Sequence, residues 1–456
     1  WVHGVVFVLH LQRSVIMKKQ RWGWSYAMVL LLSFFFFSCK QENLGTDNPD
    51  VARIPFHPLQ SESDLDLLIQ EIGDARVVLL GEASHGTAEY YEWRAAISRR
   101  LIQEKGFDFI AVEGEWADTY RVNQFVKGPR QDSAAAVSLL QRFDRWPTWM
   151  WRNYEVASLV GWMNDYNQGA SSKAGFYGLD VYSLWESVTD ILPYLQGAPD
   201  SLRQLAQQVQ QCFQPYSADE QDYAFAAGNP STGCGNLTRR LWQAVLHYTG
   251  EGPAQNEAHF VLQQNALVAL NAERYYTAAA FSNNESWNIR DRHMAQTLDR
   301  LLQFHGPQSR GIVWEHNTHV GDARATDMED EGLVNVGQLV RESYGANNVY
   351  LVGFGSYAGT VIAGSQWGAP MTEMNVPEAR PGSWEAMLHS LGASDKLILS
   401  RELRAANLLG SPIGHRAIGV VYNPASESGN YVPSVIAERY DAFLFIDRTR
   451  ALRPIR

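Results

Sequence analysis

Short apolar runs alternate with long amphipathic stretches along this chain of 456 residues. The alternation is typical of an α/β domain, in which buried strands and helices follow one another. Continuous apolar runs suit strands that are covered on both faces of a parallel sheet. We therefore predict an α/β fold with a mainly parallel sheet flanked by helices. The predicted strands lie at 76–80, 107–112, 175–178, 311–314 and 349–352.

The stretch from about 185 to 305 has no convincing strand pattern, but several of its segments have helical periodicity. We predict a helical insertion or subdomain there. Strand-like runs return after about 395, in "KLILS", "AIGVVY" and "DAFLFID". The folded domain is predicted to cover 59–456 and to follow a polar tether at 39–58.

The N-terminal segment has the pattern of an export signal. Met17, the predicted start, is followed by three basic residues and an apolar stretch at 27–37. This stretch is shorter than the ~20 apolar residues that span a bilayer. The next residues, ending in Cys39, resemble the site at which bacterial lipoproteins are cleaved and lipidated. We predict a signal segment at 1–38 and a periplasmic, membrane-anchored lipoprotein held by this lipid only; an ordinary signal or a membrane-retained tail are the alternatives.

The other two cysteines, Cys212 and Cys234, could form a disulfide in an oxidising compartment, or could be two separate thiols. Three cysteines in total exclude a cysteine metal cluster. The net charge of -11 argues against nucleic acid or an anionic membrane surface as a partner. The sequence carries no signal for a particular oligomeric state.

Ionisable or glycine-rich residues follow each of the five predicted strands. The carboxyl ends of parallel strands meet at one edge of a sheet, where ligands bind. We therefore predict an active site at this edge. An acid after a strand can also be a helix N-cap, which is the alternative for Asp180, a predicted substrate-binding residue. The other acids and histidines at these ends are Glu82, His85, Glu113, Glu115, Glu315, His316 and His319.

The residue types favour a water nucleophile, because the chain lacks a nucleophile elbow, a phosphate loop and an H-E-x-x-H motif. Glu82 lies three residues before His85 and can orient its imidazole. An ordinary histidine pKa of ~6.5 suits a general base near neutral pH. We predict no cofactor. A divalent metal is the alternative, because imidazoles and carboxylates also bind zinc-like ions; its ligands would be His85, Glu113, His316 and His319.

Two further elements are predicted to contribute to the site. Arg94 falls on the sheet-facing side of the helix after the first strand. It would clamp an oxyanion or carboxylate, or form a structural ion pair. Trp146, Trp149 and Trp151 would wall a cleft for a bulky ligand, although core packing is the commoner use of such side chains.

Several motifs occur in the order found in the erythromycin esterase family, which includes homologues assigned to succinoglycan biosynthesis. They include "GEASHGTAEYYEWR", "FIAVEGEWADTYRVNQFV", "WPTWMWRNYEVASLVGWMNDYN" and "VWEHNTHVG". The chain resembles this family over about residues 60–370. The resemblance implies hydrolysis of a macrolide lactone ester without a covalent intermediate, with His85 as the general base and Glu82 as its partner. Other residues that match the family's site are Glu113, Arg94, His316 and His319, and Arg290 and Asp291 also fit its pattern.

We therefore predict a carboxylic ester hydrolase that opens the lactone of a macrolide antibiotic, an activity that would confer resistance. His85 would remove a proton from water, while His316, His319 or Arg94 would stabilise the oxyanion. One alternative is an esterase of the same family acting on another ester or lactone. Another is a non-catalytic lipoprotein that binds a metal or a ligand.

Overall fold

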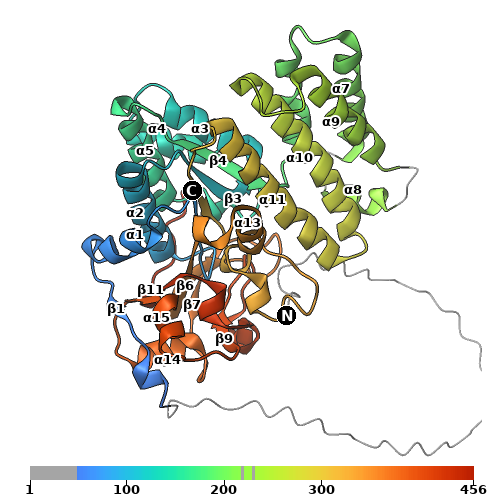
Figure 1. Cartoon of the computed structure of the whole chain (residues 1–456). Coiled ribbons are helices and arrows are strands. Elements are labelled where there is room, and N and C mark those ends of the chain that lie inside the picture. Colours follow the sequence, from blue (N-terminus) through green and yellow to red (C-terminus); the bar gives the residue numbers. More distant parts are fainter. Residues whose placement is uncertain (1–48, 217–219, 229–231) are drawn as a thin grey trace, which may run out of the picture.

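The computed structural model describes residues 49–216, 220–228 and 232–456, and in this part of the chain a nine-stranded sheet forms the centre of the molecule (Figure 1). The strand order is β1-β8-β11-β6-β2-β5-β3-β4, and β7 pairs with β6 outside this row. The strands are β1 (His57–Pro58), β2 (Val77–Leu80), β3 (Phe109–Glu115), β4 (Gly175–Asp180), β5 (Gly311–Trp314), β6 (Val349–Ala363), β7 (Thr372–Val376), β8 (Lys396–Leu399) and β11 (Ala442–Thr449).

The sheet is mainly parallel, which confirms the predicted fold class. Parallel pairing runs without interruption through β11, β6, β2, β5, β3 and β4. The five predicted strands correspond to β2 through β6. Antiparallel pairing is confined to β1 with β8, β8 with β11, and β7 with β6. The carboxyl ends of the five predicted strands therefore share one edge.

Helices cover both faces of the sheet, because alternate strand residues point to opposite sides. Val78 and Ile312 belong to one apolar core, and Leu79 and Val313 belong to the other. On the first face lie α1 (Asp66–Ile72), α2 (Ala88–Lys105), α4 (Ser133–Leu140) and α5 (Tyr154–Gly169). On the second lie α11 (Asn283–His305), α13 (Val336–Tyr344), α14 (Trp384–Ser390), α15 (Ser400–Ala405) and α16 (Ile436–Arg439), and α3 (Trp116–Lys127) contributes to both cores.

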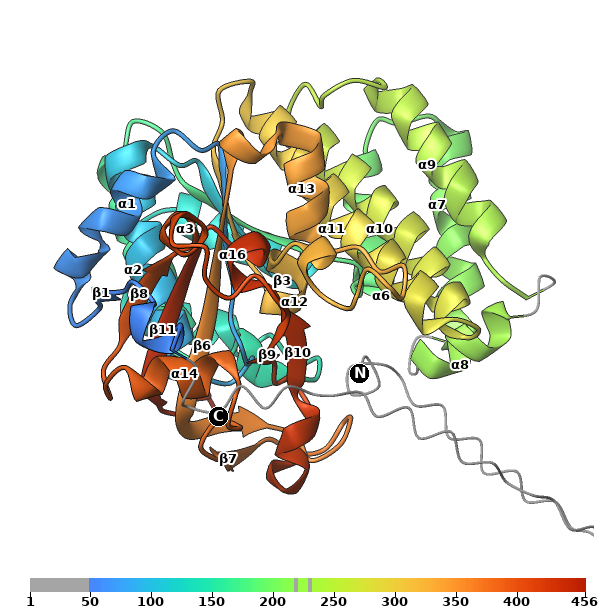
Figure 2. The same ribbon diagram turned by 60° about the horizontal axis from the view of Figure 1, so that its bottom comes forward.

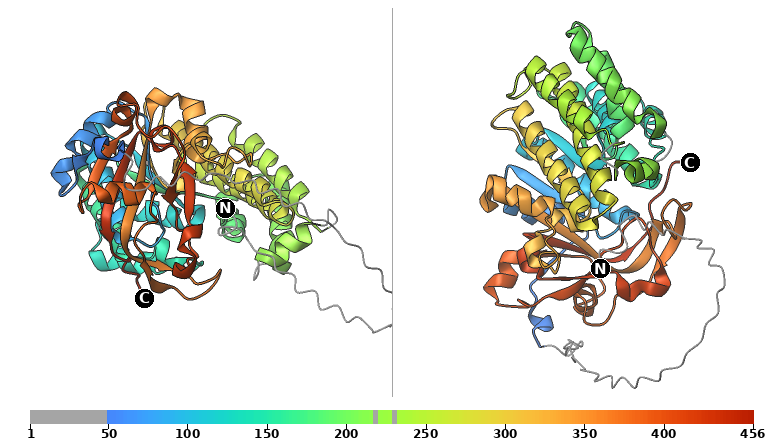
Figure 3. Two further views of the ribbon diagram at one scale, coloured as in Figure 1. Left: turned by 90° about the horizontal axis from the view of Figure 1, so that it is seen from below. Right: turned by 90° about the vertical axis from the view of Figure 1, so that its right-hand side faces the viewer.

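Between β4 and β5 the described residues form helices and loops, and this block covers the predicted helical insertion. It packs beside the sheet rather than onto it, as Figures 2 and 3 show. A separate apolar core inside the block includes Leu205, Val245 and Ala269. Its helices are α6 (Leu184–Asp190), α7 (Asp200–Phe213), α8 (Glu220–Ala227), α9 (Gly235–Thr249) and α10 (Glu257–Ala279), and α11 then leads back to the sheet.

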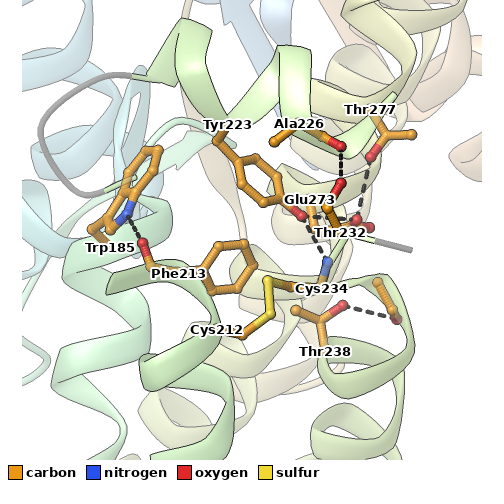
Figure 4. The surroundings of a disulfide bond; sticks show 11 residues. Trp185, Cys212, Phe213, Tyr223, Ala226, Thr232, Cys234, Thr238, Glu273 and Thr277 are labelled. Atoms are coloured by element: carbon orange, nitrogen blue, oxygen red, sulfur yellow. Dashed lines mark hydrogen bonds between the residues drawn. A yellow bond between two sulfur atoms is a disulfide. The ribbon is translucent and has the colours of Figure 1, made fainter. Parts of the chain in front are cut away.

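A disulfide joins Cys212 in α7 to Cys234 before α9 (Figure 4). The backbone N–H of Cys234 donates to the Tyr223 hydroxyl at 3.1 Å, and this hydroxyl donates to Glu273 of α10 at 3.0 Å. The disulfide and the hydrogen bonds thus connect α7, α8 and α10 with the N-cap of α9. Of the two alternatives that the sequence leaves open, the structure contains the bonded pair.

The C-terminal part differs from the prediction at "AIGVVY". The runs "KLILS" and "DAFLFID" contain β8 and β11, whereas "AIGVVY" makes only isolated bridges, at Ile418 and Val421. It is apolar because Ile418 and Tyr422 pack against the ends of β6 and β7. Its backbone passes the strand edge, where the N–H of Ile418 donates to Ala83. A small antiparallel pair, β9 (Ile413–Arg416) and β10 (Tyr431–Ser434), flanks it.

The predicted signal segment and Cys39 lie outside the described residues. The end of the predicted tether, 51–58, is part of the folded domain, because Val51 and Ile54 are buried and β1 pairs with β8. In the described part of the chain, no helix combines the length and the apolar character that crossing a membrane requires.

Candidate active site

The strand ends bring five of the predicted residues into one buried cluster. Glu82 and His85 follow β2, Glu113 lies in β3, and α12 (Asn317–Val320) follows β5 with His316 as its N-cap and His319 in its last turn. The rings of His85 and His316 lie 4.9 Å apart between centroids. His319 Nε2 lies 3.4 Å from Glu113 Oε1. The site thus forms at the predicted edge of the sheet.

His85 and Glu82 form a directed pair. His85 Nδ1 lies 2.8 Å from Glu82 Oε1, and an ionised carboxylate can only accept a hydrogen bond. The proton of a neutral His85 is therefore on Nδ1, and Nε2 presents its lone pair. Because His85 lines two cavities, this lone pair is available as a base.

Arg94 supports this pair from behind. It donates to Glu82 Oε2 at 2.6 Å, and its guanidinium is fully buried between the rings of Tyr91 and Trp314. Arg94 lines neither cavity that contains His85. The structure thus corrects the predicted role as an oxyanion clamp: a cation held this deep pairs with a carboxylate and cannot reach a substrate.

Arg290 is the centre of the second half of the site. Its guanidinium donates to both oxygens of Asp180, at 2.9 and 2.6 Å, and to Glu113 Oε1 at 2.7 Å. Both Asp180 oxygens are therefore engaged, so Asp180 holds Arg290 instead of presenting a free carboxylate to a substrate. Arg290 lies in a family motif, but the sequence gives it no role. Its helix, α11, follows the helical block, so the sequence does not show which strand end Arg290 meets.

His319 has both ring nitrogens engaged. Nδ1 lies 2.9 Å from Asp291 Oδ1, so the proton is on Nδ1. Nε2 then accepts from Arg290 at 3.0 Å. The ring also stacks on Trp287, with centroids 4.5 Å apart. A neutral His319 has no N–H left for an oxyanion, which argues against one of the predicted roles.

His316 is different, because one of its nitrogens has no side-chain partner. Its backbone N–H donates to Glu113 Oε2 at 2.8 Å, and its Nδ1 accepts the backbone N–H of Thr318 at 3.3 Å and lies 2.8 Å from the Thr318 hydroxyl oxygen. The proton of the neutral ring is therefore on Nε2. This atom is buried and has no side-chain partner among the described residues, and the backbone of Ala83 lies within reach of the ring. His316 thus places a ring N–H beside His85 and lines the smaller cavity.

The charges around the cluster set its protonation. Burial alone would lower the pKa of His85, but Glu113 and Glu82 outweigh it and raise that pKa above 6.5. Burial and the neighbouring His85 hold the pKa of His316 well below its usual range. Burial would raise the pKa of Glu113, yet His319, Arg290 and His85 lower it strongly. The resulting state has an ionised Glu113 and a neutral His316.

Glu315 is a buried acid to which the sequence analysis gave no role. It is fully buried, and neither carboxyl oxygen has a hydrogen-bond partner among the described residues. Burial and the nearby carboxylates of Glu113 and Asp291 raise its pKa well above the usual range. Glu315 is therefore a neutral carboxylic acid beneath the cluster and adds no charge to it. Its position directly after β5 is the signal that could have found it.

Two cavities meet at His85 and Glu113, which line both. The larger has a volume of about 250 Å³ and is lined by both aromatic and charged side chains. Arg145 crosses it and pairs with Glu115, at 3.4 Å, and with Glu186 of α6, at 3.0 Å. The smaller, of about 140 Å³, lies on the side of His316 and Trp287. A ligand can therefore extend to both sides of the base.

Two of the three predicted tryptophans reach the larger cavity. Trp146 and Trp151 line it, and Trp151 Nε1 donates to the backbone carbonyl of Glu113 at 3.2 Å. Trp149 differs from the prediction, because it is buried beneath Trp146 and does not line the cavity. The aromatic residues that sequence reasoning missed are Phe143, Tyr182 and Trp367.

The predicted metal alternative meets an obstacle in the charge arrangement. In the ranges that the structure describes, no group of three or more His, Cys, Asp or Glu side chains is arranged to hold a metal ion. The cation beside Glu113 and His319 is the guanidinium of Arg290. Glu113 and His319 therefore do not fit a metal in this arrangement.

A mainly parallel sheet with buried histidines and carboxylates at its carboxyl edge is typical of α/β enzymes, which bind their ligands at that edge. The sequence model described as erythromycin esterase matches residues 102–449. This chain belongs to the erythromycin esterase family and is a hydrolase of that family.

Relatives and solved structures agree with this family. The chain is 24% identical to erythromycin esterase type II of Escherichia coli over 383 residues, or 77% of this chain and 87% of the relative. It is 20% identical to the putative hydrolase YbfO of Bacillus subtilis (strain 168), over 72% of this chain and 75% of that protein. A structure titled succinoglycan biosynthesis protein has a TM-score of 0.70 at 18% identity, covering 89% of this chain and 98% of the other. A mutant of the erythromycin esterase EreC in its open conformation has a TM-score of 0.62 at 15% identity, covering 86% and 95%.

The pair of Glu82 and His85 predicts a pH shift. Because Glu82 raises the pKa of His85, replacing Glu82 by Gln lowers this pKa. The acid limb of kcat/KM for ester hydrolysis should therefore move to lower pH, since His85 stays neutral further into the acid range. An NMR titration of the His85 ring should move in the same direction.

Glu115→Gln is the matched control for this shift. Burial outweighs Arg145 and raises the pKa of Glu115 to about 7, so this acid titrates in the same range while its side chain pairs with Arg145. Its removal should leave the titration of the His85 ring in place. An unmoved His85 titration in Glu82→Gln would contradict the assigned pair.

Proposed function

We propose that this protein opens the lactone ester of a macrolide by attack of a water molecule that His85 activates. The observation that carries the proposal is the pairing of two imidazoles with opposite functions. His85 presents a lone pair on Nε2, and His316 presents an N–H on Nε2, with ring centroids 4.9 Å apart. An ester carbonyl needs such a base and such a donor.

The reaction has two proton transfers. Water loses a proton to His85 Nε2 while its oxygen bonds to the ester carbonyl carbon, and the carbonyl oxygen becomes an oxyanion. Glu82 and Glu113 stabilise the imidazolium, and the N–H of His316 donates to the oxyanion. When the tetrahedral intermediate collapses, the C–O bond to the alcohol breaks and His85 returns the proton to the leaving oxygen. No covalent bond to the protein is formed.

The two cavities support an ester with substantial groups on both sides. An ester has an acyl part and an alcohol part, and the site has room on each side of His85. The aromatic side chains of the larger cavity suit an apolar ring system. The named relative from Escherichia coli supports a macrolide. The neighbour titled succinoglycan biosynthesis protein favours a second candidate, an ester or lactone of a saccharide, with the same residues acting.

Substrate assays test both the chemistry and the substrate. The wild type should hydrolyse erythromycin, and His85→Ala should lower kcat by about 10²–10⁴-fold, the usual contribution of a general base. A plain aryl ester and an acylated saccharide are the comparison substrates. Turnover of these two without erythromycin would overturn the macrolide assignment but retain the mechanism.

A chelator is the control for metal dependence. Because Arg290 occupies the position beside Glu113 and His319, we propose a reaction without a metal, so activity should survive dialysis against a chelator. Full activity of His85→Ala would contradict the mechanism itself.

The role of His316 has its own test. His316→Phe keeps a ring of similar size but removes the N–H, so kcat should fall by about 10²–10³-fold, as for the loss of one oxyanion donor. His316→Gln, whose amide can supply an N–H at a similar reach, should recover part of the loss. Equal activity of His316→Phe and the wild type would contradict the assigned donor.

We also propose that the chain is exported and lipidated at Cys39. The disulfide between Cys212 and Cys234 supports an oxidising compartment, because such bonds are rare in reducing cytoplasm. The mature protein, isolated from bacterial membranes, should have a mass that begins at Cys39 and includes lipid. The Cys39→Ser variant should either be found outside the membrane fraction or retain its uncleaved signal segment. A mature chain that retains residues before Cys39 in the wild type would contradict the proposal.

A further inference from the structure

A further histidine–carboxylate pair lies away from both cavities. His415 of β9 and Glu385 of α14 are each fully buried, with Nδ1 and Oε1 2.6 Å apart. Neither residue lines the cavities that contain His85. Burying a carboxylate costs free energy that apolar side chains of the same size would not, so stability alone does not account for the pair.

The direction of this pair follows from the same hydrogen-bond logic as for His85. Burial would raise the pKa of Glu385, but His415 and Arg416 outweigh it and lower this pKa, so the carboxylate accepts. The His415 proton is then on Nδ1, and Nε2 accepts from the side-chain amide of Asn317 at 3.1 Å. The other charged groups near His415 are the guanidiniums of Arg416 and Arg439, and the rings of Tyr440 and Phe443 pack against it.

Asn317 has a fully specified orientation. Its amide nitrogen also donates to the carbonyl of Phe354 at 2.6 Å, and its amide oxygen accepts from the N–H of Phe354 at 3.2 Å. The amide oxygen also packs tightly against the strand end: a Cβ added to Gly81 would lie 2.2 Å from it. A glycine is therefore required at position 81, directly before Glu82.

The backbone of Asn317 connects both functional imidazoles. It directly follows His316, and its N–H donates to the carbonyl of Glu82 at 2.8 Å. Its side chain thus fixes the peptide that carries the donor His316 and, through Glu82, the residue that orients His85. Among these contacts, only the hydrogen bond from Asn317 to His415 depends on the protonation of a ring. It requires a His415 Nε2 that carries no proton.

We propose that His415, oriented by Glu385, is a positioning residue for ester hydrolysis: through Asn317 it sets the relative placement of the His316 donor and the Glu82–His85 pair. The proposal rests on the proposed function for its effect on turnover. A displacement of about 1 Å in such a pair can cost up to about 10²-fold in rate. Substrate binding should change little, because the cavity walls contain neither His415 nor Asn317.

Two variants test the acceptor. His415→Leu removes it, whereas the side-chain oxygen of Gln in His415→Gln can replace Nε2 as an acceptor for Asn317. With the ester that the wild type hydrolyses best, His415→Leu should lower kcat by about 10–100-fold with KM within about twofold. His415→Gln should recover most of kcat. His389→Leu is the matched control, since His389 pairs with Asp447 at 2.6 Å outside the site and should keep the wild-type kcat.

Nitrogen-15 NMR of the whole protein supplies a readout independent of turnover. The wild type should show His415 with its proton on Nδ1 and His316 with its proton on Nε2. In His415→Leu, the His316 signals should shift, and in His389→Leu they should not. Urea unfolding of each variant separates a loss of folding from a loss of position.

Three results would overturn the proposal: a protonated Nε2 on His415 in the wild type, unchanged His316 signals in a folded His415→Leu, or equal kcat in His415→Leu and His415→Gln. The first needs no variant, so it applies even if His415→Leu fails to fold. Failure of the proposed function looks different. It would appear as full activity in His85→Ala, with the His415 and His316 signals still as expected.

Discussion

The guanidinium of Arg290 is the interaction on which the site depends. It comes from α11 and binds Asp180 at the end of β4, Glu113 in β3 and His319 in α12. Each of these carboxylates is buried, and a buried charge without a partner is strongly unfavourable. One cation thus pairs with acids from two strands at the wall of the larger cavity. The helical block that precedes α11 therefore contributes to the site as well as to the shape of the molecule.

The remaining charges are arranged in pairs that fix proton positions. Arg94 binds Glu82, Glu82 orients His85, and Asp291 orients His319. The carboxylate beside His85 and the carboxylate beside His319 each fix the ring proton on Nδ1 and leave Nε2 as the acceptor. The outcome is a cluster in which His85 has a free lone pair and His316 has an N–H without a side-chain partner. Burial lowers the local dielectric constant, which strengthens the hydrogen bonds that the His85 lone pair and the His316 N–H can form.

Much of this arrangement could be predicted from short-range patterns. The five apolar runs were long enough to identify strands, and the polar residue after each run identified the carboxyl edge. The spacing of Glu82 and His85 within one turn also predicted their pairing. Contacts from distant elements could not be predicted in this way. Arg290 reaches Asp180 across 110 positions, and nothing local to "NIRDRHM" indicates which strand it meets. Trp149 and Trp151 likewise look equivalent in the sequence, but only Trp151 lines a cavity.

The sequence by itself determined the parallel sheet, the edge that carries the site and the residues His85, Glu82, Glu113, His316 and His319. These follow from periodicity and from residues next to each other in the chain. Only the tertiary structure decided what each residue can do. It placed Arg94 behind Glu82, engaged both nitrogens of His319 and left one N–H of His316 without a side-chain partner. The physical reason is that a donor or an acceptor is defined by its neighbours in space, and burial removes the water that would otherwise satisfy any of them.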